Sequence, residues 1–252
     1  MKKIIVFDTE TTSINKPFCY NIGFCVCGVT NNDIIILDTY EFMAKQVWYN
    51  TMLFSTAYFA DKKELYHERI RNKFIDVKRW NEIVDILIDV IEKNNISAVY
   101  AYNSPFDVKV MTFMCDWFKT YNPFNDIPVF DIRDFFMNSI ENSDNYKDFC
   151  ENNQFFTDSK NYSTTAETAY RYIENDTNFI EEHTALADSE IETDILKWCY
   201  KNGVDIFTNI KSIKSIPRKI KQKYIVKQGD SKYVFYGTGA TWYKKRNTLL
   251  IK

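Results

Sequence analysis

Near its N-terminus the chain reads Ile4-Ile5-Val6-Phe7-Asp8-Thr9-Glu10-Thr11-Thr12, an apolar run followed at once by two acids. The β-branched residues of this run predict a strand that is buried on both faces. Because side chains alternate along a strand, Asp8 and Glu10 are expected on one face and Thr9 on the other. Two carboxylates held together repel each other, and a divalent cation such as Mg²⁺ offsets that repulsion. The stretch therefore predicts a metal site at the end of a buried strand, unless the strand simply runs out into a polar turn.

A further acid follows the strand signal at residues 96–102, in the sequence Asn103-Ser104-Pro105-Phe106-Asp107. Ser104 suits the N-cap of a helix and Pro105 suits its first position, which predicts a helix over 105–120. Asp107 would then lie in the first helical turn, beside the C-terminal end of the strand. The helix dipole favours an acid there without any function, so this position alone leaves both interpretations open.

The third segment is His183-Thr184-Ala185-Leu186-Ala187-Asp188. On one straight helix, residues five apart lie roughly 140° from each other, so His183 and Asp188 would not share a face. If both serve one site, His183 must lie on the loop that enters a helix over 184–201, with Thr184 as the N-cap. The other histidine of the chain, His67, is expected to be structural or solvated.

In this order and with these local spacings, the three segments resemble the three exonuclease motifs of the DEDDh 3′→5′ exonucleases. That family includes the proofreading epsilon subunit of bacterial replicases, RNase T and oligoribonuclease. Residues 20–23 and 130–134 add weaker markers, so the resemblance covers about the first two hundred residues. Ser13 stands where many members have glycine, and Ala101-Tyr102-Asn103 replaces a more usual His-Asn pair, but neither departure touches a metal-ligand position. The resemblance implies an RNase H-like α/β fold, with a mixed central sheet flanked by helices.

The resemblance also implies a reaction, the hydrolysis of single-stranded DNA or RNA from the 3′ end to nucleoside 5′-monophosphates with two Mg²⁺ or Mn²⁺ ions. Asp8, Glu10 and Asp188 would hold the first ion, Asp8 would bridge to the second, and Asp107 would reach the second largely through water. His183 would be the general base that takes a proton from the attacking water. Glu10 and Thr11 would lie close to the terminal 3′-hydroxyl. The resemblance also implies substrate contacts for Thr12, Asn103 and Phe106. For Phe106, burial as an aromatic of the core is an equally good expectation.

Charge divides the chain into two parts. Residues 201–252 contain 13 basic and two acidic residues, a net charge of +11. Residues 1–200 contain the remaining 19 basic and 32 acidic residues, a net charge of −13. We therefore expect an exonuclease domain over 1–204, with an insertion at about 44–76, and a basic, aromatic C-terminal extension over 205–252. Basic residues interleaved with aromatics suit single-stranded nucleic acid, and a solvated basic face is the alternative.

The pattern of apolar residues predicts the remaining elements. The insertion over 44–76 is rich in aromatics and is expected to be partly helical and near the mouth of the site, where its aromatics would stack on bases or bury against the sheet. Residues 139–163 are polar and are expected to form an irregular loop. The other expected elements are strands over 3–9, 20–29 and 33–42, a helix over 77–94, a strand over 97–102, a short strand or turn near 128–131 followed by a helix, short helices over 164–174 and 177–182, and a hairpin around Gly229-Asp230.

The six cysteines form no C-x-x-C pair, and the sequence has neither a signal-peptide pattern nor an apolar run that would span a membrane, so a reducing cytoplasm is expected. Zinc is not expected. The Asn-, Lys- and Ile-rich composition is typical of an AT-rich genome, such as that of a phage. Two alternative functions stay open, a nuclease of very short or signalling oligonucleotides and a nucleic-acid-binding accessory subunit of a replicase. The expected partner is the 3′ end of a single strand, with a polymerase or a second copy of the chain as further partners.

Overall fold

A mixed six-stranded sheet forms the centre of the protein in a computed structural model, which describes residues 1–57, 59–218, 222–228 and 231–237. The strands lie in the order β4-β3-β2-β1-β5-β6. β1 pairs antiparallel with β2 and β2 with β3, whereas the β1–β5, β5–β6 and β3–β4 pairs are parallel. The strands are β1 (Lys2–Thr11), β2 (Cys19–Val29), β3 (Ile34–Ala44), β4 (Asp76–Lys78), β5 (Ile96–Ala101) and β6 (Val129–Asp131).

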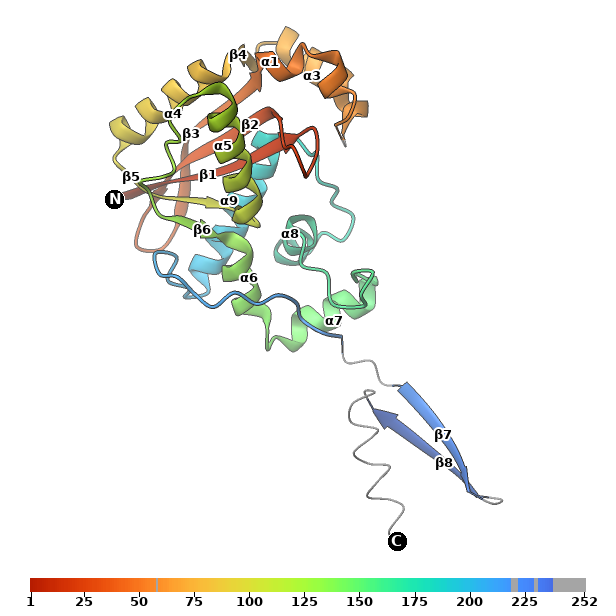
Figure 1. The fold of residues 1–252 in the computed structure, drawn as a ribbon. Helices are drawn as coiled ribbons and strands as arrows, with labels where there is room; N and C mark the ends of the chain where they lie inside the picture. Colours follow the sequence, from red (N-terminus) through yellow and green to blue (C-terminus); the bar gives the residue numbers. More distant parts are fainter. Residues whose placement is uncertain (58, 219–221, 229–230, 238–252) are drawn as a thin grey trace.

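β1 is buried on both faces, and its alternating side chains divide the interior into two cores. Ile5 and Phe7 belong to one apolar cluster, which also holds residues of α4 (Trp80–Asn94) and α5 (Ser104–Phe118). Ile4 and Val6 belong to the other, together with residues of α6 (Ile132–Ile140) and α9 (Ala185–Lys201). The sheet therefore lies between two layers of helices (Figure 1). This is the mixed α/β sheet flanked by helices that the sequence predicts.

The insertion and the segment before α9 supply the remaining helices. They are α1 (Lys45–Trp48), α2 (Thr51–Phe54), the 3-10 turn η1 (Ala60–Lys62), α3 (Lys63–Arg71), α7 (Asp144–Asn153) and α8 (Ala166–Glu174). The insertion is thus partly helical, as expected. Trp48, Phe54 and Tyr66 are buried in the core beside the sheet, which is the second of the two alternatives, whereas Tyr49 and Phe74 are exposed.

Two expectations between α6 and α9 were wrong. Residues 139–163 are not an irregular loop, because α7 forms there: the Ser143 hydroxyl accepts the backbone N–H of Tyr146, and Tyr146 and Cys150 bury one face of the helix. Residues 177–182 are not helical, because side chains of α8 occupy their backbone groups. Arg171 donates to the carbonyl of Phe179 and Glu167 accepts the N–H of Glu181.

The packed body continues past residue 204. Ile206 and Ile216 are buried in the second core, and the Tyr100 hydroxyl donates to the Ile206 carbonyl at 2.8 Å. Beyond this segment, β7 (Gln222–Gln228) and β8 (Ser231–Gly237) form the expected antiparallel hairpin. The basic aromatic stretch 242–246 lies outside the described residues. None of the helices in the described part of the chain combines the length and apolar character needed to cross a bilayer.

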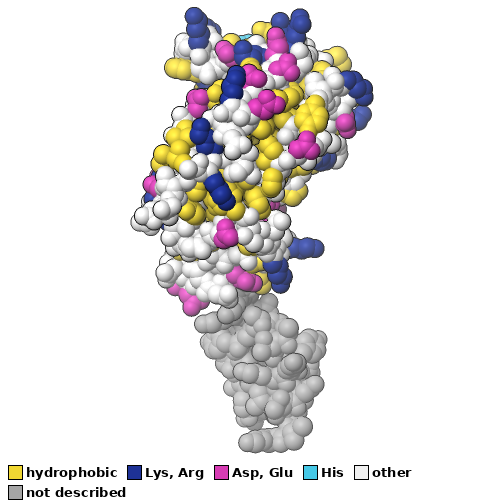
Figure 2. Space-filling view, turned by 90° about the vertical axis from the view of Figure 1, so that its left-hand side faces the viewer, with side chains coloured by type: hydrophobic (Ala, Val, Ile, Leu, Met, Phe, Trp, Pro, Cys, Tyr) yellow, Lys and Arg dark blue, Asp and Glu magenta, His cyan; other side chains and the backbone are white. Residues whose placement is uncertain are grey.

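The face drawn in Figure 2 has no large area of positive charge alone or of negative charge alone. Lys and Arg side chains alternate there with Asp and Glu, and hydrophobic side chains lie between them. Charge of one sign is instead concentrated at the end of β1.

Candidate active site

The side chains of Thr9 and Glu10 at the end of β1 point in opposite directions, Thr9 towards α5 and Glu10 towards α9. Thr9 points towards α5, where its hydroxyl donates to Asp107 Oδ1 at 2.6 Å. Glu10 lies on the opposite face of the strand, where the Tyr20 hydroxyl donates to its Oε2 at 3.4 Å. The hydrogen bond from Thr9 thus holds Asp107 at the same end of the sheet as the β1 acids.

Asp107 is placed by a sharp turn between β5 and α5. Asn103 adopts a left-handed conformation (φ 62°) and is the N-cap, one residue before the Ser104 that the sequence favoured, with Pro105 in the first turn. The Asn103 backbone N–H donates to Asp131 Oδ1 at 2.9 Å, which ties the turn to the end of β6. Asp107 follows in the first helical turn and is buried.

His183 and Asp188 converge because the chain bends sharply before α9. His183 has a left-handed backbone (φ 54°) and lies on the loop that enters the helix, and Thr184 is the N-cap. The capping hydrogen bond comes from β2 instead of Thr184, since Asn21 Oδ1 accepts the Ala185 N–H at 2.8 Å. α9 also approaches β2 closely, because a Cβ added at Gly23 would lie 2.2 Å from the backbone nitrogen of Leu186. The third segment is therefore fixed to the sheet at its first turn.

Glu10, His183 and Asp188 come together with the geometry of a metal site. One ligand atom of each lies within 4.8 Å of the others. His183 Nδ1 is 3.8 Å from Asp188 Oδ2 and 3.7 Å from Glu181 Oε2. Asp188 Oδ1 is buried and has no hydrogen-bond partner among the described residues. A buried carboxylate oxygen without a donor is costly, so this donor set fits a bound divalent cation.

The insertion holds the segment that carries His183. The Phe59 ring stacks on the His183 imidazole, with centroids 4.3 Å apart and planes 16° apart. Arg69 bridges the buried Glu41 at 2.7 Å and Glu182 at 2.9 Å. The Tyr66 hydroxyl donates to Asn21 Oδ1 and lies 3.4 Å from the His183 carbonyl. These contacts place the insertion at the edge of the site, as expected for 44–76.

Two acids of this cluster were not found from the sequence. Glu181 faces His183, as its distance to Nδ1 shows. Glu192 is buried, and its Oε2 accepts the Tyr102 N–H at 3.0 Å. The spacing of Glu192 offered a signal, because a residue four positions after Asp188 lies on the same face of a helix.

The expected substrate residues lie around this cluster with different exposures. Thr11 and Asn103 reach solvent, whereas Thr12 is buried and its N–H donates to the Phe18 carbonyl at 3.0 Å. Phe106 is partly buried and packs against the first core, which is the alternative stated for it. Thr11 and Asn103 are thus the more accessible of the four.

Burial and mutual repulsion raise the pKa of the acids at this site. Removal from water is the largest cause at each carboxyl. It raises the pKa of Glu10 to about 8, with repulsion by Asp188 as the next cause, and it raises the pKa of Asp107 to about 7. Asp8 keeps some contact with solvent, but protein atoms crowd its carboxyl, and this desolvation, followed by Asp107, also raises its pKa well above the ordinary value. Interaction with Asp188 raises the pKa of His183.

These shifts predict how the stability of the metal-free protein depends on pH. The pKa of Glu10 is about 8 and that of Glu181 about 7 when the chain is folded, against about 4.3 for an unfolded Glu. Between these values the folded chain binds more protons than the unfolded chain, so the free energy of unfolding decreases as pH rises. We expect the Tm of EDTA-treated protein to fall by several degrees between about pH 5 and pH 8, since about 1 kcal/mol corresponds to about 2–4 °C.

Adding Mg²⁺ or Mn²⁺ at the upper end of this range should restore the lost Tm, because a bound cation offsets the repulsion. Differential scanning calorimetry at several pH values, with EDTA and with each metal, measures both effects. A Tm that neither falls with pH nor responds to metal would contradict the prediction.

Solved structures place the fold. No protein-family model matches the sequence, and no curated protein matches it. Among solved structures, the nuclease domain of 3′hExo, a DEDDh family member, bound to rAMP, is similar with a TM-score of 0.54 and 13% identity over 80% of this chain and 93% of that chain.

Two structures of E. coli Exonuclease I are also similar. The complex with a dT13 oligonucleotide gives a TM-score of 0.50 and 12% identity over 79% of this chain and 41% of that chain. The zinc-bound form of its complex with single-stranded DNA gives a TM-score of 0.51 and 12% identity over 82% of this chain and 42% of that chain. The similarity thus spans less than half of Exonuclease I. This protein therefore has the RNase H-like α/β fold that is found in the DEDDh exonucleases.

Proposed function

We propose that the chain is a metal-dependent 3′→5′ exonuclease of the DEDDh family that releases nucleoside 5′-monophosphates from a single strand. The observation that carries the proposal is the meeting of Glu10, His183 and Asp188 at the end of β1, in the fold of known exonucleases. Asp8 and Asp107 complete the set, since repulsion from Asp107 contributes to the raised pKa of Asp8. A module that only binds nucleic acid has no need of all five side chains.

Two Mg²⁺ or Mn²⁺ ions are the proposed cofactors, with Asp8, Glu10, Asp107 and Asp188 as their ligands. The orphaned Oδ1 of Asp188 and the predominance of carboxylate oxygens support hard divalent cations. When bound, such ions stabilise charge on the phosphate oxygens and lower the pKa of a coordinated water.

His183 is the proposed general base. The Phe59 ring orients its imidazole, and 31% of its side chain remains exposed. In the reaction the oxygen of water attacks phosphorus, and the proton of that water passes to His183. The bond between phosphorus and the O3′ of the penultimate nucleotide breaks, and this O3′ then takes a proton from solvent. Glu181 and Asp188 stabilise the imidazolium that forms, because both carboxylates face Nδ1.

The proposed substrate is the 3′ end of single-stranded DNA or RNA, with Thr11, Thr12, Asn103 and Phe106 around the terminal nucleotide. The similar structures hold rAMP in one case and oligo-dT in another, so both sugars belong in the test. We also propose that the basic extension contacts the phosphate backbone, and that it begins after residue 218, because the core includes Ile216. A polymerase or a second copy of the chain are further proposed partners.

Labelled single strands test this proposal. DNA and RNA of one sequence, labelled at the 5′ end, are incubated with the protein in Mg²⁺, Mn²⁺ or EDTA. We expect a ladder that shortens from the 3′ end with metal only, and none with Asp8→Ala. The absence of a ladder on both strands, with cleavage of dinucleotides, would favour the nuclease of very short oligonucleotides. Salt-dependent binding that survives Asp8→Ala, without turnover of any substrate, would favour the accessory-subunit alternative.

A further inference from the structure

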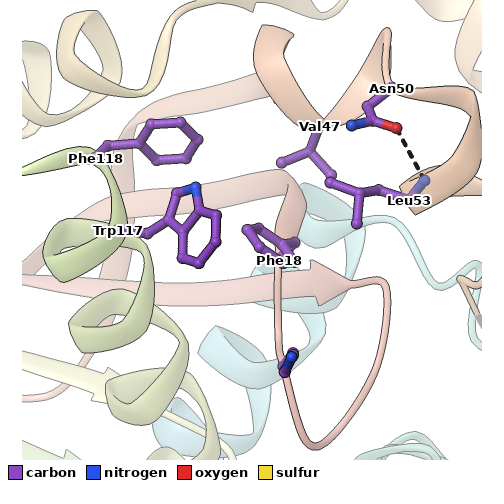
Figure 3. Close-up of a pocket in the computed structure, with 7 residues that line it drawn as sticks. Phe18, Val47, Asn50, Leu53, Trp117 and Phe118 are labelled. Atoms are coloured by element: carbon purple, nitrogen blue, oxygen red, sulfur yellow. Dashed lines mark hydrogen bonds between the residues drawn. The ribbon is translucent and has the colours of Figure 1, made fainter.

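An apolar groove lies between the loop 12–18, the helices α1 and α2, and the end of α5. Its volume is about 430 Å³, which is within the range of roughly 300–1,000 Å³ typical of ligand pockets. In Figure 3 the rings of Phe18, Trp117 and Phe118 form one side of this groove, and Val47 and Leu53 face them from the other side. Lys16 and Asn50 complete the lining. None of these residues belongs to the catalytic cluster.

Trp117 is the most unusual member of this lining. Its side chain is 60% exposed and borders an apolar groove, and exposed apolar side chains that gather around a groove mark binding sites. A second hollow of about 400 Å³ is lined by Phe113, Asp116, Trp117 and Lys119. The Phe18 ring packs edge-on against the indole at 5.0 Å, and Phe113 stacks beside it at 6.1 Å. The indole is therefore held in place by its neighbours while it borders two open hollows.

The groove is linked to the proposed active site through α5 and the loop 12–18. Trp117 lies ten residues after Asp107 on α5, so it is about 15 Å from the level of Asp107 along the helix axis. Phe18 is tied to the same region, because its carbonyl accepts the N–H of Thr12, two residues after Glu10. Lys109 Nζ donates to the Ile14 carbonyl at 2.8 Å, which fixes the loop 12–18 against α5. A strand whose 3′ end occupied the site would reach the groove within a few nucleotides.

The polar groups at the rim suit a polyanion. Lys16 and Lys119 are exposed, one at each hollow, and Asp116 is the acid among the lining residues. Asn50 uses its Oδ1 to accept the Leu53 N–H, so its amide nitrogen is the group that it offers to a ligand. Aromatic faces with nearby cations are the features on which single-stranded nucleic acids stack without sequence preference.

We propose that this groove, built on Trp117 and Phe18, binds unpaired bases of the substrate strand upstream of its 3′ end. This inference rests on the proposed exonuclease function and adds a second binding region to it. Bases stack against the Trp117 indole, and Lys16 and Lys119 contact the adjacent phosphates. The groove thereby selects single strands over duplexes, because paired bases have no free face to stack.

Binding measured without turnover tests the groove separately from the nuclease. Fluorescence anisotropy in EDTA gives the affinity for labelled oligo-dT of two, four, eight and twelve nucleotides. We expect Trp117→Ala to weaken binding of the eight- and twelve-nucleotide strands by at least about fivefold, the effect of losing one stacked base, and Trp117→Phe to recover much of the loss. Lys16→Gln should reduce the dependence of affinity on salt.

The matched control is Phe74→Ala, which removes an aromatic ring that is 69% exposed and does not line the groove. Equal affinities for Trp117→Ala and wild type at every length, or an equal loss in Phe74→Ala, would overturn the proposal. If the wild type is a dimer and Trp117→Ala is a monomer with unchanged strand binding, the groove serves self-association and the proposal is overturned. If Trp117→Ala loses affinity only for the longer strands and the wild type hydrolyses no substrate, the groove proposal stands and the nuclease proposal is refuted.

Discussion

Asp188→Asn is expected to lower the rate of 3′-end hydrolysis by at least about 10³-fold and, at the same time, to raise the Tm of the metal-free protein. The loss of rate follows from the position of this carboxylate in the proposed metal site, where its Oδ1 is buried without a partner. The gain in stability follows from its neighbours, since Asp188 contributes to the raised pKa values of Glu10, Asp8 and Glu181. Removing one charge relieves this repulsion while the shape of the side chain is kept.

Glu190→Gln is the matched control for this experiment, because it removes the same charge from an exposed position two residues along α9. Single-turnover rates at saturating Mn²⁺ and calorimetry in EDTA give the two quantities for each variant. Glu190→Gln should retain the wild-type rate of hydrolysis. An Asp188→Asn protein that keeps more than about a tenth of the wild-type rate would show that the carboxylate is not a ligand in the reaction.

Gly23→Ala is expected to have the largest effect on stability, a loss of about 3 kcal/mol or more. The added Cβ would meet backbone atoms on the first turn of α9, 2.2 Å from the Leu186 nitrogen and 2.4 Å from the Ala185 carbonyl carbon. A helix backbone has no room to yield there, because Ser189 also donates to the Gly23 carbonyl at 3.0 Å. α9 would have to move away from β2, and Asp188 would move with it. Activity should therefore fall together with stability.

Gly28→Ala provides the comparison on the same strand. Its Cβ would meet the end of the flexible Met1 side chain, with the sulfur at 2.7 Å, and this side chain can turn away. We expect this variant to differ from wild type by less than about 1 kcal/mol in urea unfolding. Equal unfolding midpoints for the two alanine variants would show that α9 does not depend on its close approach to β2.

The elements predicted well from the sequence are those whose signal is local and repeated. The apolar run before Asp8 and the helical spacing from Trp80 to Val90 each describe a face that is buried along its whole length. The bend at His183 was also expected, because helical geometry rules out a shared face for residues five apart. The candidate site was expected at the end of β1 because Asp8 and Glu10 directly follow the apolar run.

Contacts between distant segments were not accessible in this way. Asn21 caps α9 across 164 residues of sequence, and no local pattern marks an asparagine in a strand for that role. α7 was missed because the polar composition of its exposed face hid the burial of Tyr146 and Cys150. The boundary after residue 204 was set by charge, whereas the burial of Ile206 and Ile216 depends on the apolar surface presented by the rest of the fold.

The order of the catalytic segments along the chain has a consequence for protein synthesis. Translation delivers the N-terminal strands first, and the loop and helix that carry His183 and Asp188 emerge more than 160 residues after Asn21, which later caps that helix. A nascent chain that has reached only β1, β2 and β3 contains Asp8 and Glu10, but it holds neither the proposed base nor the last acid. The proposed nuclease is thus inert in a nascent chain until the segment that carries His183 and Asp188 has been made and packed against the sheet.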